Sequence, residues 1–247
     1  MIIQEKFPAF PLSIIIPALN EEKALPGVLA SLETQEDDPP FELVLADGGS
    51  ADATVPRFLE LTRSWPVRGR AARALRCARP GRAAQLNMGA REAAGKALLF
   101  LHADTSLPPG ATGAVLGALS DPEVIGGAFR HAYAEAGLIL SWISLWANSR
   151  SRLGGVHLGD QAMFARRSDF EKIGGFPEVP LFEDLRLSRA LRLRGRVVTL
   201  PLYAVTSARR LREAGAVRMG LRYAWLEMRH ALGADPSRLK DDYPDVR

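Results

Sequence analysis

Three aspartates have the neighbours expected of residues that do chemistry together. Asp47 follows the apolar run 41–46, Asp104 follows the run 97–101, and Asp184 stands where a helical pattern begins. Ligands of open α/β sheets bind outside the carboxyl ends of the strands, so one sheet edge would gather all three carboxylates. Such a group suits a metal-bound nucleotide diphosphate and a hydroxyl that must lose a proton.

The elements needed to position these residues alternate along the first hundred residues. Short apolar runs predict strands at 13–17, 41–46 and 97–101. Helical patterns lie between them, from Asn20 through about residue 32, from Ser50 or Asp52 through 62, and over 82–95. This alternation predicts one α/β domain with a mostly parallel, doubly wound sheet flanked by helices.

The remaining segments are more mixed. The stretch 63–82 carries seven arginines between proline breakers and predicts a solvated, irregular connection. Beyond residue 110 we expect a helix through 119, a strand near 126–130, an apolar helix around Trp142, a strand at 162–165 and a helix opening at Glu183. The C-terminal third is expected to be helical and basic.

Composition narrows the setting of the protein. The chain has 247 residues and a net charge of +4, which suits one sizeable core and favours anionic partners. Cys77 is its only cysteine, so no intramolecular disulfide can form and a reducing compartment is expected. No secretory signal pattern opens the chain, which favours the cytoplasm.

One apolar segment leaves a membrane contact open. The uncharged run 136–149 is too short to span a bilayer, but Trp142 and Trp146 lie four apart and Arg150 and Arg152 follow. An interfacial helix at the inner face of a membrane has this pattern, and so does a core helix or a homodimer helix.

Several common sites are excluded by spacing. Gly89 to Lys96 has too many intervening residues for a phosphate-binding P-loop and precedes a strand where it should follow one. No dinucleotide fingerprint, nucleophile elbow or zinc-type cysteine pair is present. With four Tyr, four Trp and no interleaving of basic and aromatic residues, a nucleic-acid partner is disfavoured.

Five motifs occur in an order that resembles glycosyltransferase family 2 over roughly residues 11 to 205. They are residues 13–22 (SIIIPALNEE), 47–54 (DGGSADAT), 81–89 (GRAAQLNMG), 102–104 (HAD) and 183–184 (ED). The resemblance implies an A-type glycosyltransferase fold, a nucleotide-sugar donor and a divalent metal, Mn²⁺ or Mg²⁺. It also implies a nucleotide-binding half over about 11–105, an acceptor half over about 106–205 and a basic helical segment over about 206–247.

The resemblance assigns the donor nucleoside to the first two motifs. Pro17, Ala18, Asn20 and Glu22 would border the nucleoside, and Asp47 would accept a hydrogen bond from a pyrimidine ring N–H. An aspartate before two glycines is also a common turn former, which explains Asp47 without a ligand.

Arginines are assigned to the phosphates. Arg82 would face the diphosphate, whose oxygens its planar fork can hold in pairs. Arg209 and Arg210 would reach the pyrophosphate from the C-terminal segment. A solvated basic surface explains any of the three taken alone.

The metal motif of the family is altered here. Asp104 matches the last acid of its Asp-x-Asp pattern, and His102 stands where the first acid would be. Imidazole suits Mn²⁺ better than Mg²⁺, so His102 either shifts the metal preference or leaves Asp104 as the main protein ligand. A strand-end histidine bonded to a backbone carbonyl is the alternative.

The last motif implies the catalytic base. Asp184, with Glu183 second, would take the proton of the acceptor hydroxyl in an inverting displacement, while Asp160 and Gln161 would contact the sugar or the acceptor. Acids in the first turn of a helix also suit its dipole, which is the structural alternative.

These roles predict inverting transfer from a uridine-type nucleotide sugar to an unidentified hydroxyl. The His-Ala-Asp variant and the Gly-Asp-Gln loop look like a bacterial subgroup that modifies unusual acceptors, with arsenosugar biosynthesis as an analogy. A sugar-phosphate nucleotidyltransferase and a non-catalytic membrane-surface module are the alternatives.

Overall fold

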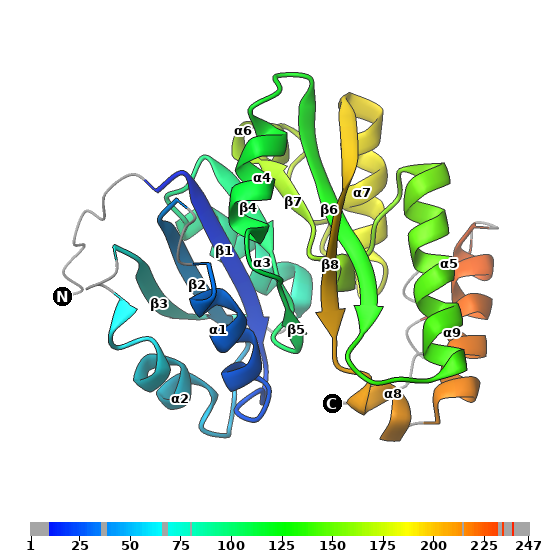
Figure 1. The fold of residues 1–247 in the computed structure, drawn as a ribbon, viewed down its shortest axis with the longest axis horizontal. Helices are drawn as coiled ribbons and strands as arrows, with labels where there is room; N and C mark the ends of the chain where they lie inside the picture. Colours follow the sequence, from blue (N-terminus) through cyan, green and yellow to red (C-terminus); the bar gives the residue numbers. More distant parts are fainter. Residues whose placement is uncertain are drawn as a thin grey trace.

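A single eight-stranded sheet runs through the described part of the chain (Figure 1). The computed structural model describes residues 10–35, 39–65, 69–79, 81–213, 215–231, 234 and 239. The strands are β1 (Leu12–Ala18), β2 (Phe41–Asp47), β3 (Ala71–Arg76), β4 (Ala97–Phe100), β5 (Thr105–Ser106), β6 (Val124–Tyr133), β7 (Phe164–Arg166) and β8 (Arg196–Thr206). The helices are α1 (Leu25–Glu33), α2 (Thr54–Leu61), α3 (Arg82–Glu92), α4 (Ala111–Leu119), α5 (Leu138–Gly154), α6 (Arg167–Lys172), α7 (Glu183–Arg194), α8 (Arg209–Glu213) and α9 (Ala216–Ala231), with a 3₁₀ turn, η2, at Gly159–Gln161.

The sheet order β3-β2-β1-β4-β7-β6-β8-β5 gathers the strand ends at one edge. Strands β1 to β4 are mutually parallel, and β6 is parallel to β8. Strand β7 runs antiparallel to both β4 and β6, so β6 and β8 point the same way as β1 to β4. The mostly parallel α/β sheet expected from the sequence is therefore confirmed, with β5 and β7 as the reversed strands.

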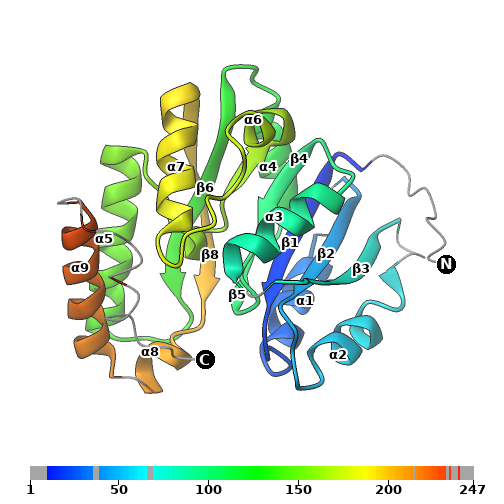
Figure 2. The same cartoon turned by 180° about the vertical axis from the view of Figure 1, so that it is seen from behind.

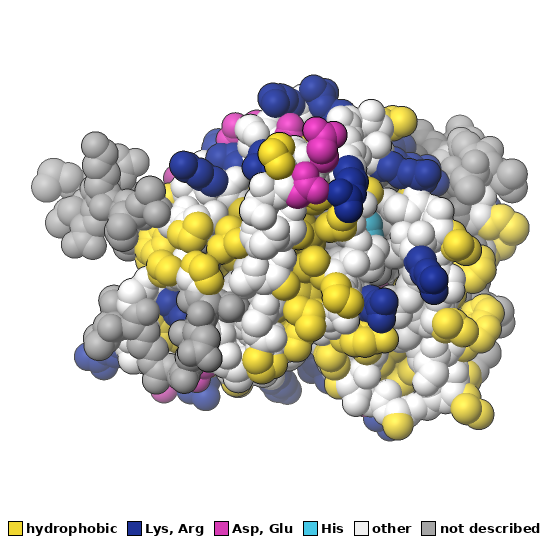
Figure 3. Space-filling model, turned by 45° about the horizontal axis from the view of Figure 1, so that its top comes forward, with side chains coloured by type: hydrophobic (Ala, Val, Ile, Leu, Met, Phe, Trp, Pro, Cys, Tyr) yellow, Lys and Arg dark blue, Asp and Glu magenta, His cyan; other side chains and the backbone are white. Residues whose placement is uncertain are grey.

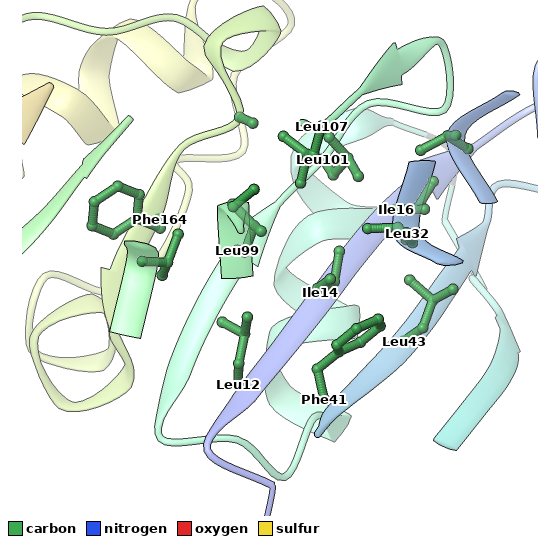
Figure 4. Packing of buried hydrophobic residues seen from close by; sticks show 14 of the residues in the cluster. Leu12, Ile14, Ile16, Leu32, Phe41, Leu43, Leu99, Leu101, Leu107 and Phe164 are labelled. Atoms are coloured by element: carbon green, nitrogen blue, oxygen red, sulfur yellow. The ribbon is translucent and has the colours of Figure 1, made fainter. Parts of the chain in front are cut away.

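Both faces of the sheet are covered by helices, which explains the continuous apolar strands. All seven residues of β2 are buried, as expected for a strand covered on both faces. Helices α1 and α4 lie over one face (Figure 1), and α3, α6 and α7 lie over the other (Figure 2). The larger core, on the face of α1 and α4, contains alternate residues of β1 such as Leu12, Ile14 and Ile16 (Figure 4).

Two expectations from the sequence are wrong. The arginine-rich stretch expected to be an irregular connection contains strand β3, and its Arg70 is buried. The Arg70 guanidinium donates to the Leu32 and Gln35 carbonyls, at 3.1 and 2.6 Å, and lies 4.9 Å from the centre of the Phe41 ring. The C-terminal third, expected to be helical, contains β8, the longest strand described.

Helix boundaries also differ from the expectation. Helix α1 begins at Leu25, five residues after Asn20, because residues 19–24 form a loop over the end of β1. Helix α7 does begin at Glu183, as its sequence predicted.

Candidate active site

The first part of the site is built from the adjoining ends of β1 and β2. Ala18 pairs with Asp47 in the parallel register, and the Gln85 amide of α3 donates to the Ala18 and Ala46 carbonyls, at 2.7 and 2.9 Å. A Cβ at Gly48 would lie 2.8 Å from Gln85 Nε2, so the glycine lets α3 approach both strand ends. Sequence reasoning gave no role to Gln85, although it lies within the third motif.

The loops after β1 and β2 are locked together by side chains. Asn20 Oδ1 accepts from the Ala51 N–H, and Glu22 Oε2 accepts from the Ala53 N–H, both at 2.9 Å. Asn20 has a left-handed backbone, with φ of 57°. The Asn20 and Glu22 side chains therefore hold the rim of the site together, while half-buried Pro17 and buried Ala18 line the strand end below it.

Asp47 has the geometry of a turn former. It is 3% exposed, and its carboxylate accepts from the Gly49 and Ser50 N–H groups, each at 3.1 Å. The Ser50 N–H also lies 3.2 Å from Oδ2, and each carboxylate oxygen has two acceptor positions, so these three contacts leave capacity for one more donor. Beside it, burial and then the Asp47 charge raise the pKa of the Cys77 thiol to about 11, which leaves the thiol protonated and unreactive at neutral pH.

The second part of the site is a point where three segments meet. A Cβ at Gly159 would lie 2.6 Å from His102 Nε2 and 3.2 Å from Asp184 Oδ2. The Gly159 N–H donates to Asp184 Oδ2 at 2.8 Å, which fixes the carboxylate toward the imidazole. Residues 102, 159 and 184 are thus brought together from the end of β4, from η2 and from the start of α7.

His102 is held in its neutral form. Burial and the nearby Arg82 charge lower its pKa, although Asp104, Asp160 and Asp184 act in the opposite direction. A neutral imidazole keeps a lone pair that can bind a metal.

The donor set at the end of β4 suits a divalent cation shared with a ligand. No group of three or more His, Cys, Asp or Glu side chains that could hold a metal occurs among the described residues. The neutral imidazole of His102 and the half-buried carboxylate of Asp104 supply two donor groups. They fit a divalent cation that takes its other ligands from diphosphate oxygens and water.

The two acidic residues at the start of α7 have different partners. Glu183 forms an ion pair with Arg82 and is 3% exposed. Asp184 accepts from the Leu185 N–H at 2.7 Å and from Gly159, and its Oδ2 lies 3.9 Å from Arg82 Nη2. Arg82 is therefore anchored by Glu183 beside Asp184, inside the site but already paired with protein carboxylates.

Two residues that sequence reasoning missed lie behind Asp160. Buried His131 of β6 has its Nε2 3.5 Å from Asp160 Oδ2, and Tyr133 packs edge-on against the His131 ring. Burial, followed by the Asp160, Asp104 and Glu135 charges, raises the pKa of Tyr133. The alternating apolar pattern of a strand carries no signal that would single out these two positions.

The expectation that Gln161 contacts the sugar or acceptor is at odds with its placement. Its side chain is fully buried, with Oε1 accepting from the Leu158 N–H at 3.1 Å and Nε2 donating to Phe129 O at 3.2 Å and Ser151 Oγ at 2.8 Å. The amide is used to fix η2 against α5 and β6. Asp160, its neighbour, keeps a half-buried side chain among the site carboxylates.

The C-terminal arginines lie close to the metal motif along the backbone. The Ser207 N–H donates to the Asp104 carbonyl at 3.0 Å, and exposed Arg209 follows at the start of α8. The side chain of Arg210 lies outside the part of the structure that is described.

The arrangement combines three capacities at one sheet edge. The strand ends of β1 and β2 carry the Asp47 carboxylate, the end of β4 carries two groups that could bind a cation, and the start of α7 carries the Asp184 carboxylate. Arg82 supplies a fixed positive charge between Glu183 and Asp184.

Comparison with known proteins places this chain among enzymes that transfer sugars. The model of glycosyl transferase family 2 matches residues 13–174. A 55-residue stretch is 40% identical to the uncharacterized glycosyltransferase YfnE of Bacillus subtilis (strain 168), covering 22% of this chain and 14% of that protein.

Solved structures share the fold. The mannosyltransferase PcManGT from Pyrobaculum calidifontis, in complex with GDP-Man and Mn²⁺, aligns with a TM-score of 0.68 and 21% identity over 95% of this chain and 68% of its own. The S. aureus TarS 1–349 structure with UDP-GlcNAc aligns with a TM-score of 0.57 and 18% identity over 79% of this chain and 58% of its own. The arrangement of the sheet is thus that of these transferases.

Proposed function

Because the chain belongs to glycosyl transferase family 2, we propose that this glycosyltransferase moves a sugar from a uridine-type nucleotide sugar to a hydroxyl acceptor with inversion at the anomeric carbon. The observation that carries the proposal is the meeting of Asp184, His102 and Gly159 beside the acid-anchored Arg82. It provides one proton acceptor and one cation-binding group at neighbouring positions.

The proposed reaction is a single displacement. The acceptor oxygen forms a bond to the anomeric carbon as the bond from that carbon to the diphosphate oxygen breaks. Asp184 takes the hydroxyl proton, and the nucleoside diphosphate leaves with the bonding electron pair. Gly159 and Leu185 hold the Asp184 carboxylate in place throughout.

The negative charge that develops on the leaving diphosphate needs stabilisation. Arg82 offers a positive charge whose position is set by its ion pair with Glu183. Asp104 and His102 would hold the divalent cation, which when bound neutralises charge on the phosphates. Exposed Arg209, two residues after the Ser207 that hydrogen-bonds the Asp104 carbonyl, is proposed to supply a further cation, and Arg210 is proposed for the same role from the sequence alone.

The donor base is proposed to lie at the ends of β1 and β2. Asp47 retains acceptor capacity for a uracil N–H, and the locked loops carrying Asn20 and Glu22 form a rigid rim around it. The structures that share this fold contain GDP-Man in one case and UDP-GlcNAc in another, so the choice of base is the point to test.

A thermal-shift panel tests donor class and cation together. UDP with Mn²⁺ should raise the melting temperature of the wild type, since a ligand of the folded state alone stabilises it. GDP should raise it less, and Asp47→Asn should weaken the UDP effect because the amide can turn its N–H₂ group toward the ring donor. Asp121→Asn is the matched control, because this half-buried carboxylate pairs with Arg196 at the start of β8 and belongs to none of the motifs assigned to the donor.

Two results would contradict the proposal. If no nucleoside diphosphate raises the melting temperature, the donor assignment fails. If the enzyme consumes a nucleoside triphosphate and releases pyrophosphate, it is a nucleotidyltransferase. The acceptor class suggested by the His-Ala-Asp and Gly-Asp-Gln motifs, with its arsenosugar analogy, stays a prediction.

A further inference from the structure

Helix α5 turns several polar side chains inward. Asn148 exchanges two hydrogen bonds with the His131 backbone, at 2.7 and 2.9 Å, and Ser144 Oγ lies 3.1 Å from His131 Nδ1. Buried Ser151 hydrogen-bonds the Gln161 amide. Leu140, Ala147 and Ile143 also face inward, but a surface helix normally packs its whole apolar stripe on the core, so the large apolar side chains that α5 leaves in solvent are unusual.

The outward side of α5 is correspondingly apolar. Leu138, Trp142, Leu145 and Leu153 are 92%, 63%, 64% and 85% exposed, and Trp142 stacks on Trp146 with ring centres 6.5 Å apart. Helix α9, which packs beside α5, adds two more exposed apolar side chains. We name this surface the α5–α9 face; it consists of Leu138, Ile139, Trp142, Leu145, Trp146, Leu153, Trp225 and Met228.

Arginines are concentrated in the segments that carry this face. Helix α5 carries two arginines and no acid, and residues 209–231 carry six arginines and two glutamates, so these segments hold more positive charge than the net +4 of the whole chain. Arg152 and Arg218 are exposed, and the Arg229 guanidinium lies 4.6 Å from the centre of the Trp225 ring. Figure 3 shows hydrophobic side chains at the α5 end of the molecule, with Lys and Arg side chains nearby.

The face also adjoins the candidate active site. Glu135, three residues before Leu138, accepts from Ser207 Oγ at 3.2 Å and from the Ala208 N–H at 2.7 Å. Ser207 in turn donates its N–H to the Asp104 carbonyl. The start of α5 is thus tied to the strand end that carries the metal motif.

We propose that the α5–α9 face docks on the surface of a bilayer that contains anionic lipids. Paired tryptophans and leucines flanked by arginines have the composition of an interfacial helix, in which apolar side chains enter the acyl boundary and arginines meet the headgroups. No helix among the described residues is long and apolar enough to span a bilayer, so the contact is peripheral.

A second copy of the chain fits this face less well. A two-fold dimer brings the same patch of both copies together, so arginine-rich rims would face arginine-rich rims. An anionic bilayer instead offers the opposite charge over the whole surface. The proposal concerns a partner surface and does not depend on the donor or the reaction proposed above.

Vesicle cosedimentation with the full chain tests the proposal. The wild type should pellet with phosphatidylcholine vesicles that contain phosphatidylglycerol, and its tryptophan emission should shift to shorter wavelength. Trp142→Ser combined with Trp146→Ser should lower the partition coefficient by about tenfold or more. Leu59→Ser, which removes an exposed apolar side chain from α2 at the other end of the molecule, should match the wild type.

A charge variant tests the role of the arginines. Arg152→Gln combined with Arg218→Gln should reduce binding to the anionic vesicles by about fivefold for each arginine removed, with little effect on pure phosphatidylcholine. Circular dichroism and melting temperature should show that both double variants fold like the wild type.

Three results would overturn the proposal. The first is that the wild type fails to pellet with anionic vesicles, and the second is that the double tryptophan variant pellets as well as the wild type. The third is a dimer in light scattering that the tryptophan substitutions convert to a monomer while vesicle binding is absent, which would show that a second copy covers the face.

Discussion

The missing side chain at Gly159 determines the distance between the two groups proposed for metal binding and proton transfer. An added methyl group there would lie within 3.2 Å of both His102 Nε2 and Asp184 Oδ2, and its neighbours would have to move. The Gly159 N–H also orients the Asp184 carboxylate. Small displacements at reacting groups are costly, since about 1 Å of misplacement can lower a rate about a hundredfold.

Gly159→Ala should therefore lower kcat by about ten- to a hundredfold while the protein stays folded. Steady-state kinetics beside a melting curve would measure both effects. Gly117→Ala is the matched control, because a Cβ at Gly117 in α4 meets no atom within 4 Å. Wild-type kcat in Gly159→Ala would show that the convergence is not used in the reaction.

Asp184→Asn removes the proposed base without changing its shape. The amide oxygen can still accept from the Gly159 N–H, so donor binding should remain close to wild type, while transfer should fall by about 10² to 10⁴. Donor affinity by calorimetry and sugar transfer by product release separate the two quantities. Equal loss of both would indicate that Asp184 supports the fold and takes no proton.

Helix α3 is the element that joins the core to the site. Its small residues let it lie directly on β1, where a Cβ at Gly89 would come 2.5 Å from Ile15 Cγ2. From that position Gln85 reaches the ends of β1 and β2, and Arg82 reaches Glu183. The spacing between this helix and the sheet thus sets the positions of two site residues.

Gly89→Ala should destabilise the fold by about 1–3 kcal/mol, as overpacking does in a close-packed core. The gain in helix propensity, about 1 kcal/mol, offsets only part of this. Urea unfolding would measure the change. Gly117→Ala should be neutral or stabilising in the same assay, and an equal effect of both substitutions would mean that contact with Ile15 is not the cause.

At the scale of the whole molecule, the buried side chain of His157 makes stability depend on pH. His157 is 2% exposed; its ring Nε2 lies 2.9 Å from Thr199 Oγ1 of β8, and its backbone N–H donates to Ser188 Oγ of α7 at 2.7 Å. Burial, and then the Arg150 charge, lower its pKa from 6.5 to about 4. The unfolded chain binds a proton at this residue before the folded protein does.

The contribution of His157 to stability is therefore complete above about pH 6.5 and is lost as the pH falls toward 4. The full loss is about 3 kcal/mol, because each pKa unit corresponds to about 1.4 kcal/mol. Denaturant unfolding of the wild type and of His157→Gln between these pH values gives the free energy of unfolding at each pH. The wild type should lose more of this free energy than the variant as the pH falls, and the difference measures the contribution of His157. Parallel pH profiles for the two proteins would assign the acid sensitivity to other groups.

Local sequence patterns predicted much of the secondary structure around the site. Buried strands such as β1 and β2, the aspartate at the end of β2 and the acidic start of α7 were predicted because each has a signal within a few residues. The order of the motifs along the chain also pointed to the family that comparison confirms. The roles of individual site residues remain predictions.

Only the tertiary structure decided which polar groups turn inward. Arg70 is buried in a segment whose composition indicated solvent, and Gln161 hydrogen-bonds in the interior beside half-buried Asp160. Helix α5 turns a serine and an asparagine inward beside its buried leucine and alanine. The physical reason is the distance along the chain over which each signal acts. Periodicity and turn chemistry act over a few residues, whereas the burial of a polar group depends on hydrogen-bond partners that the fold supplies from distant parts of the chain.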